Sequence, residues 1–153
     1  MRIAVLTSGG DAPGMNATIR AVVRTALAHN DKIFGVYEGY KGLIEGRFVE
    51  FNRSDVSVIL NRGGTILGTA RLPEFQYDEI AKLAVKQLRK NDIDALICIG
   101  GDGTYRGALK LNKLGFPTIG IPATIDNDVS STDFTIGFST ALWVVISNSS
   151  SNS

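Results

Sequence analysis

Short, uninterrupted apolar runs alternate with amphipathic helical stretches along this chain, and this order strongly restricts its fold. The runs at 3–6, 33–37, 94–99 and 118–121 predict buried strands. Strands that are apolar on both faces and alternate with helices are typical of a parallel sheet covered on both sides. The sequence therefore predicts an α/β fold, a three-layer αβα sandwich with a mainly parallel, Rossmann-like sheet.

The predicted helices are recognised by apolar residues that recur every three or four positions. The first is expected to begin with Asn16 as its N-cap, and two more are predicted at 77–91 and 105–114, with Gly115 at the C-terminal cap of the latter. The apolar core positions expected on the first helix and on 77–91 are Ile19, Val22, Val23, Ala26, Leu27, Ile80, Leu83, Ala84 and Leu88.

The stretches between these elements are predicted from local signals. Residues 39–47 are expected to form a turn, 48–51 a short strand, and 55–60 a short helix capped by Ser54. Residues 62–71 are rich in glycine and are predicted to be a long loop. Loops of this length inside compact domains are usually functional.

Charge, hydropathy and cysteine content exclude several classes of partner and of cellular location. Lysine and arginine number 16 against 15 aspartate and glutamate, a formal net charge of +1 that attracts neither nucleic acid nor an anionic membrane. No apolar run approaches the roughly 18 residues that span a bilayer, so we expect neither membrane insertion nor secretion. The lone cysteine, Cys98, is expected to be a core residue of a cytoplasmic protein.

The chain is expected to be one truncated domain followed by a tail. Residues 1–146 form the predicted α/β domain, with a last helix from about Gly137. Residues 147–153 consist only of serine and asparagine and cannot bury an apolar face. We therefore expect this tail to be disordered and the chain to be a fragment.

Two glycine-rich loops each follow a predicted strand and precede a predicted helix. Glycines at 8–14 let the backbone approach a phosphate at the positive end of a helix dipole, although a tight turn explains any one of them equally well. The loop at 101–104 adds Asp102, a hard oxygen ligand suited to Mg²⁺ carried by a nucleotide. Because no P-loop lysine pattern occurs, Arg71 is the candidate that meets the phosphate charge.

Further carboxylates follow the strand predicted at 118–121. Asp126 and Asp128 are two residues apart, so in an extended segment they share one side and favour a bound cation or a raised pKa. This suits a general base beside a metal, and an exposed Asx-rich turn is the alternative. If 94–99 and 118–121 are parallel neighbours, about 4.8 Å apart, Asp102 meets Asp126 and Asp128 in one small volume.

Two arginines on the first predicted helix lack an acidic partner at helical spacing. Arg20 and Arg24 lie at i and i+4, away from the apolar stripe. Such a pair usually belongs to a solvated face, and a phosphate-bearing ligand that bridges both is the alternative.

Taken together, five motifs resemble the N-terminal half of bacterial ATP-dependent 6-phosphofructokinase, over residues 2 to about 142. They are LTSGGDAPGMN at 6–16, RGGT at 62–65, AR at 70–71, GGDGT at 100–104 and TIDND at 124–128. The resemblance implies that family's N-terminal domain fold. It also implies an in-line transfer of the γ-phosphoryl group from ATP to fructose 6-phosphate.

The resemblance assigns roles to individual residues. Asp102 would hold Mg²⁺, Asp126 would accept the proton of the sugar 1-hydroxyl, and Asp128 would support the metal. Thr124 and Ile125, with Asp126, would bind the sugar phosphate. The positions that match the nucleotide-binding motifs are Gly10, Arg71, Leu72, Gly101, Asp102, Gly103 and Thr104.

Two small residues favour ATP over pyrophosphate as the donor in this resemblance. Pyrophosphate-using relatives place an aspartate where this chain has Gly103 and a lysine where it has Ala123, and both side chains fill space that ATP needs. Ala123 also differs from the glycine that is usual in bacterial ATP enzymes.

The resemblance extends to regulation and assembly. Arg20, Arg24 and Arg53 resemble arginines that bind ADP or phosphoenolpyruvate between subunits, and Val58 stands where relatives often have an acid. The family is homotetrameric, so a homotetramer is expected of the full-length protein. Its sugar-phosphate site also draws arginines from a later domain and a neighbouring subunit.

Two alternative functions stay open at this point. The GGDGT motif is also used by NAD kinases and diacylglycerol kinases, although the segments at 8–16 and 124–128 argue against them. The isolated chain is alternatively a catalytically inactive fragment that at most binds nucleotide, because half of the cleft is missing.

Overall fold

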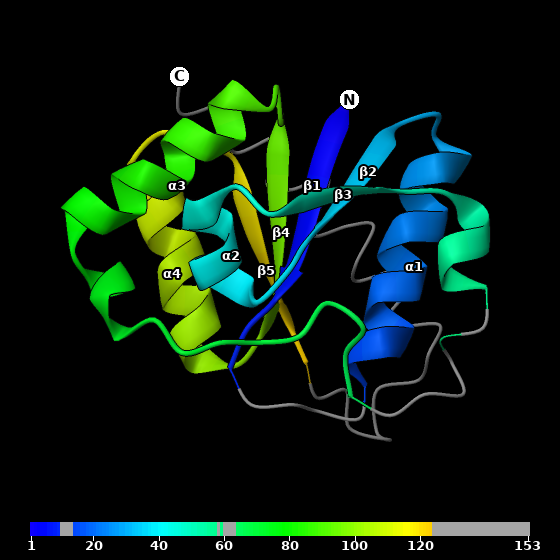
Figure 1. Cartoon of the computed structure of the whole chain (residues 1–153), viewed down its shortest axis with the longest axis horizontal. Coiled ribbons are helices and arrows are strands. Elements are labelled where there is room, and N and C mark those ends of the chain that lie inside the picture. The colour runs from blue at the N-terminus through cyan, green and yellow to red at the C-terminus, as the bar shows by residue number, and fades with distance from the viewer. Residues whose placement is uncertain (10–13, 58, 60–63, 124–153) are drawn as a thin grey trace.

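The computed structural model describes residues 1–9, 14–57, 59 and 64–123. Strands and helices alternate along most of this part of the chain (Figure 1). The strands are β1 (Arg2–Thr7), β2 (Lys32–Val36), β3 (Phe48–Phe51), β4 (Ala95–Gly100) and β5 (Thr118–Pro122). The helices are α1 (Met15–Ala28), α2 (Gly39–Glu45), α3 (Asp78–Lys90) and α4 (Asp102–Lys113), with 3-10 turns η1 (Arg53–Val56) and η3 (Pro73–Gln76).

The strands form one sheet in the order β3-β2-β1-β4-β5. All neighbouring pairs are parallel except β2 and β3, which are antiparallel. The chain builds outward from β1 to β2 and then returns to the other side of β1 with β4. Strand order therefore reverses between β1 and β4, and ligands of such sheets bind beyond the carboxyl ends of the strands at this point.

Helices cover both faces of the sheet, as the three-layer prediction requires. Ile3 and Val5 of β1 belong to the core beneath α1, whereas Ala4 and Leu6 belong to the core on the opposite face. This alternation follows from the two-residue period of a strand. Figure 1 shows α1 on one side of the sheet and α2, α3 and α4 on the other. No helix in the described ranges is both long and apolar enough to cross a bilayer.

Residues 39–45 form helix α2, where a turn was expected. Glycine-rich sequence gives this segment a low helix propensity. The structure buries Tyr40 and Leu43 of α2 in the core that α3 and α4 share. Tertiary burial therefore overrides the local preference.

The expected caps also differ from the observed ones. Gly14 precedes α1, so Asn16 lies inside the first turn, where its Oδ1 accepts a hydrogen bond from the Ile66 N–H at 2.7 Å. The helix expected at 55–60 is instead η1, and Asn52 rather than Ser54 caps it. Asn52 and Asp55 exchange side-chain to backbone hydrogen bonds, which is a capping box.

The predicted core face of α3 is correct except at Leu83. Ala84 and Leu88 are fully buried, and Ala81 is buried beside them, but Leu83 is 45% exposed. Ile80 is partly buried against the same core. Ala81 thus takes the core position that the pattern assigned to Leu83.

Two leucines on α3 provide a matched test of this packing. Leu88→Ala should lower the free energy of unfolding by about 2–5 kcal/mol, because it empties a fully buried site. Leu83→Ala should change it by no more than about 0.5 kcal/mol, because the side chain is exposed. Denaturant unfolding of the 153-residue chain, followed by circular dichroism, measures both. Equal losses would contradict the observed orientation of α3.

Candidate functional site

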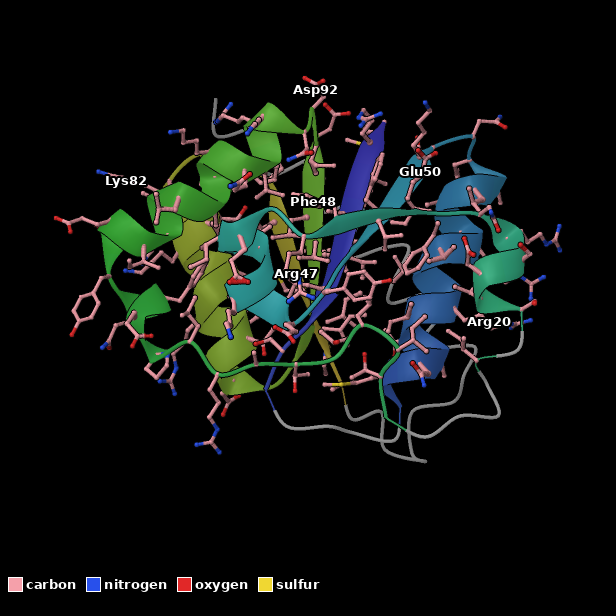
Figure 2. The ribbon with its side chains drawn as sticks, viewed as in Figure 1. Arg20, Arg47, Phe48, Glu50, Lys82 and Asp92 are labelled. Carbon is pink, nitrogen blue, oxygen red and sulfur yellow. The ribbon has the colours of Figure 1, made fainter. Side chains whose placement is uncertain are left out.

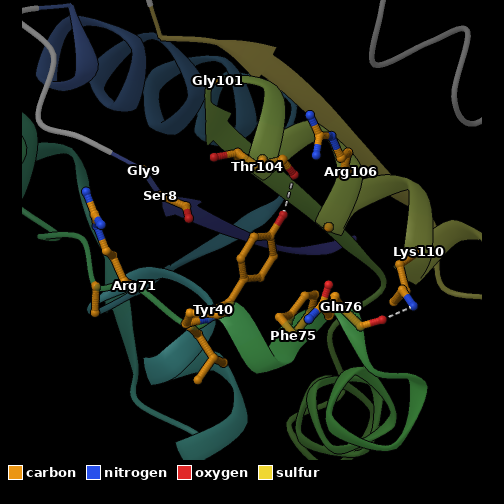
Figure 3. A pocket seen from close by; sticks show the side chains of 15 residues that line it. Ser8, Gly9, Tyr40, Arg71, Phe75, Gln76, Gly101, Thr104, Arg106 and Lys110 are labelled. Carbon is orange, nitrogen blue, oxygen red and sulfur yellow. Dashed lines mark hydrogen bonds between the residues drawn. The ribbon is translucent and has the colours of Figure 1, made fainter.

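A cleft of about 720 Å³ opens at the carboxyl edge of the sheet. The segments that line it are far apart in sequence: the end of β1, α2, the residues around Arg71, η3 and the first turns of α4. Figure 3 shows Arg71 and Thr104 on separate walls of this cleft with Tyr40 between them. The predicted nucleotide-binding residues among its lining are Arg71, Leu72, Gly101, Gly103 and Thr104.

The first turn of α4 presents backbone amides to the cleft, and the side chains of Arg106 and Lys110 line it further along the helix. Gly101 is the N-cap of α4 and supplies no side-chain cap. The first N–H groups of a helix have no acceptor within the helix, and the helix dipole adds partial positive charge there. An added Cβ at Gly101 or Gly103 would meet no atom within 4 Å among the described residues. No described residue therefore occupies the space into which these two Cβ atoms would project, next to amides that favour an anion.

Thr104 presents an unusual hydroxyl at the same place. The residue is 3% exposed, and its Oγ1 has no hydrogen-bond partner within the described part of the chain. A buried hydroxyl without a partner is costly.

Arg71 provides the opposing positive charge. It lines the cleft from the loop that precedes η3 and forms no ion pair with any described residue. Lys110 lines the same cleft, but its Nζ lies 2.8 Å from Asp78 Oδ1. The Lys110 ammonium holds the pKa of Asp78 below its usual value by a hydrogen bond and by charge.

Tyr40 joins the two walls of the cleft. Its hydroxyl donates a hydrogen bond to the Thr104 carbonyl at 2.6 Å, and its ring stacks on Phe75 of η3 with centroids 4.2 Å apart. A Cβ at Gly107 would lie 2.6 Å from the ring, so glycine is needed there. Burial raises the pKa of Tyr40 well above its usual value, so the hydroxyl keeps its proton into the alkaline range.

Sequence reasoning missed this arrangement of Tyr40, Phe75 and Gly107. The three residues lie in three different elements, and no periodicity or motif connects them. They come into contact because the folded chain places α2 beside α4.

Asp102 occupies a neighbouring hollow of about 340 Å³ rather than the main cleft. This hollow lies between the ends of β4 and β5 and shares Gly101 and Thr104 with the cleft. The parallel pairing of β4 and β5 is confirmed, with Gly100 opposite Pro122. No group of three His, Cys, Asp or Glu side chains within the described residues forms a ready-made metal site.

The remaining predicted residues divide into two groups. Gly10, Thr124, Ile125, Asp126 and Asp128 lie outside the described residues, as do Val58 and the tail at 147–153. The arginines Arg20, Arg24 and Arg53 lie on α1 and η1, which pack together on the sheet face opposite α4.

The arginine group has no acidic partner among the described residues. Arg24 and Arg53 are exposed, Arg20 is half-buried, and the Arg20 Nε is buried without a hydrogen-bond acceptor there. Figure 2 shows Arg20 on the η1 side of α1. These cations are therefore available to an anion, on a surface separate from the cleft.

Known proteins resemble this chain in both sequence and fold. The family model described as phosphofructokinase matches residues 2–151. The ATP-dependent 6-phosphofructokinases of Vibrio campbellii and Vibrio cholerae are each 58% identical over 145 residues, which cover 95% of this chain and 45% of each relative. The structure of Pichia pastoris phosphofructokinase in the T-state matches with a TM-score of 0.78 and 40% identity, over 83% of this chain and 15% of that one. The chain thus spans less than half the length of these relatives.

Cys98 provides a chemical test of the described core. It is fully buried in β4, and burial raises the pKa of its thiol to about 12. Because thiolates are the reactive form, Ellman's reagent at neutral pH should label the native chain only at the rate at which it unfolds. Denatured chain should react at once, and since this is the only cysteine the signal is unambiguous. Equally rapid labelling of native and denatured chain would contradict the burial.

Proposed function

The chain belongs to the phosphofructokinase family, and we propose that the full-length protein transfers the γ-phosphoryl group of ATP to fructose 6-phosphate. The observation that carries this proposal is a single cleft with helix amides at Gly101–Thr104 on one wall and, on another, Arg71, which forms no ion pair with any described residue. Positioning and charge neutralisation are the main requirements of phosphoryl transfer. Membership of this family favours a sugar phosphate as acceptor over NAD or diacylglycerol.

ATP is the donor that fits the space around the glycine loop. The missing side chain at Gly103 leaves room beside the amides, and Ala123 is small and buried. The phosphates of ATP would contact Gly10, Gly101, Gly103 and Thr104. Arg71 would meet their charge, with Leu72 beside it in the cleft wall.

Asp102 is the residue that would hold Mg²⁺. It is exposed at the start of α4, next to the amides that would bind the phosphates. Mg²⁺ commonly binds one or two carboxylates together with substrate phosphates, which fits a lone carboxylate at this position. When bound, the ion neutralises charge on the phosphates.

Asp126 would be the general base. The chain leaves β5 beside the glycine loop, because the Ala123 N–H donates to the Gly100 carbonyl at 2.9 Å, and Asp126 follows three residues later. The oxygen of the sugar 1-hydroxyl attacks the γ-phosphorus while Asp126 takes the proton of that hydroxyl. The bond between the γ-phosphorus and ADP breaks, and ADP departs with the electrons of that bond. Asp128 would support the metal, while Thr124 and Ile125 would bind the sugar phosphate.

The arginines on α1 and η1 would form an effector site. Arg20, Arg24 and Arg53 lie on adjacent packed elements without acidic partners among the described residues, which suits an anion such as ADP or phosphoenolpyruvate.

We further propose a cytoplasmic homotetramer for the full-length protein. The isolated chain would bind nucleotide but lack turnover, since it covers 45% of its relatives.

Gly103→Ala separates nucleotide binding from folding. A methyl group there enters the open space where the phosphates would lie, so the Kd for Mg-ATP should rise about tenfold or more. Stability should be equal or higher by up to about 1 kcal/mol, because alanine is the better helix former. Calorimetric titration and denaturant unfolding of the chain measure the two effects. The control Lys113→Ala, an exposed position on the last turn of α4, should keep the original Kd.

Turnover of the full-length protein tests the reaction itself. In a coupled assay that offers fructose 6-phosphate, NAD or diacylglycerol with Mg-ATP, only the sugar phosphate should be consumed. Asp126→Asn should lower kcat by about 10²–10⁴ and leave the Kd for Mg-ATP unchanged, because only the proton acceptor is lost. Phosphorylation of another acceptor, or an unchanged kcat, would refute the proposal.

A further inference from the structure

The segment that carries Arg71 is attached to the sheet through one buried hydroxyl. Residues 64–71 form neither helix nor strand. At the end of β1, the Thr7 side chain is fully buried and its hydroxyl donates to the Gly68 carbonyl at 2.9 Å. The same Oγ1 lies 2.8 Å from the Thr65 Oγ1. Thr7 therefore contacts this segment at two points.

The direction of these hydrogen bonds follows from proton counting. A threonine hydroxyl has a single proton, and Thr7 gives its proton to Gly68. The hydroxyl of Thr65 must then donate to Thr7, and its own oxygen accepts from the Leu67 N–H at 3.1 Å. These three hydrogen bonds form a continuous series from the Leu67 N–H through the Thr65 and Thr7 hydroxyls to the Gly68 carbonyl, and each of the three donors is used.

Other contacts fix the upstream part of the segment. Asn16 accepts from the Ile66 N–H and donates its own N–H to the Gly64 carbonyl. The Leu67 carbonyl accepts from the Glu38 N–H at 2.9 Å. Downstream of Gly68, by contrast, Thr69, Ala70 and Arg71 make no hydrogen bond with any described residue.

We propose that Thr7 is a positioning residue for Arg71. Its hydroxyl fixes Gly68, the last anchored residue before Arg71, so that the guanidinium is held beside the cleft. Valine has nearly the same shape and would fill this strand position without the cost of burying a hydroxyl. Packing alone therefore does not account for threonine at this position. This inference rests on the proposed binding of nucleotide phosphates by Arg71, and Thr7 itself does not contact the nucleotide.

The test is a double-mutant cycle on the 153-residue chain. Thr7→Val should raise the Kd for Mg-ATP about tenfold, and Thr7→Ser, which keeps the hydroxyl, should stay within about twofold of the original. Once Arg71→Ala has removed the guanidinium, adding Thr7→Val should change the Kd by less than about twofold, because Thr7 acts through Arg71. An equal effect of Thr7→Val with and without Arg71 would overturn the inference.

A measurement without ligand separates this inference from the proposed function. Backbone ¹⁵N order parameters of residues 69–71 should fall below about 0.6 in Thr7→Val and stay near about 0.85 in Thr7→Ser. Unchanged order parameters in Thr7→Val would overturn the inference even if the chain binds ATP. Loss of order in Thr7→Val but not in Thr7→Ser, together with no ATP binding by the unmodified chain, would uphold the inference and refute only the proposed nucleotide binding by this chain.

Folding of the variants is checked by circular dichroism. If Thr7→Val does not fold, Thr7→Ala also removes the hydroxyl that donates to the Gly68 carbonyl. It should reproduce both the loss of affinity and the loss of order, and failure to do so would overturn the inference.

Discussion

The parallel alignment of β1, β4 and β5 is the constraint on which the site depends. Parallel strands end at one edge of a sheet, so the segments after Thr7, Gly100 and Pro122 meet there. Backbone hydrogen bonds from Ser8 to Ile99 and from Ala123 to Gly100 extend the strand pairing into these segments. Thr7 lies opposite Ile99, and Gly100 lies opposite Pro122. Apolar side chains hold these strands between two helical layers. The packing of those side chains therefore sets the spacing of the polar groups at this edge of the sheet.

Backbone groups and neutral side chains form much of the cleft, beside the cations Arg71, Arg106 and Lys110. The glycine loop offers N–H groups, Tyr40 fixes a carbonyl of that loop, and Thr7 fixes the loop that carries Arg71. Such groups are oriented by the fold before a ligand arrives, so binding requires little reorganisation. Of the cations that line the cleft, Lys110 is paired with Asp78, whereas Arg71 and Arg106 form no ion pair with any described residue.

Most of the fold followed from the sequence because its signals are local. The apolar runs became β1, β2, β4 and β5, and Gly115 follows the end of α4 with a positive φ, as a C-terminal glycine should. Helix α2 was missed because its stability comes from burying Tyr40 and Leu43 rather than from propensity. Asn16 was misassigned because a side chain that caps a helix and one that holds a distant loop look alike in sequence.

The candidate site was predictable in part for the same reason. Arg71 and the residues at 101, 103 and 104 line one cleft as expected, because they belong to contiguous motifs. Tyr40, Phe75 and the hydroxyl of Thr7 act across elements, so their contacts exist only in the folded chain. The roles of Asp126 and Asp128 stay predictions.

Nucleotide binding between the β4–α4 loop and Arg71 can be mapped by following the amide chemical shifts of the ¹⁵N-labelled chain during titration with Mg-ATP. The largest changes are expected at residues 101–104 and around 71, with little change on α1 or at the far ends of the strands. Large changes confined to α1 and η1, or none anywhere, would contradict it.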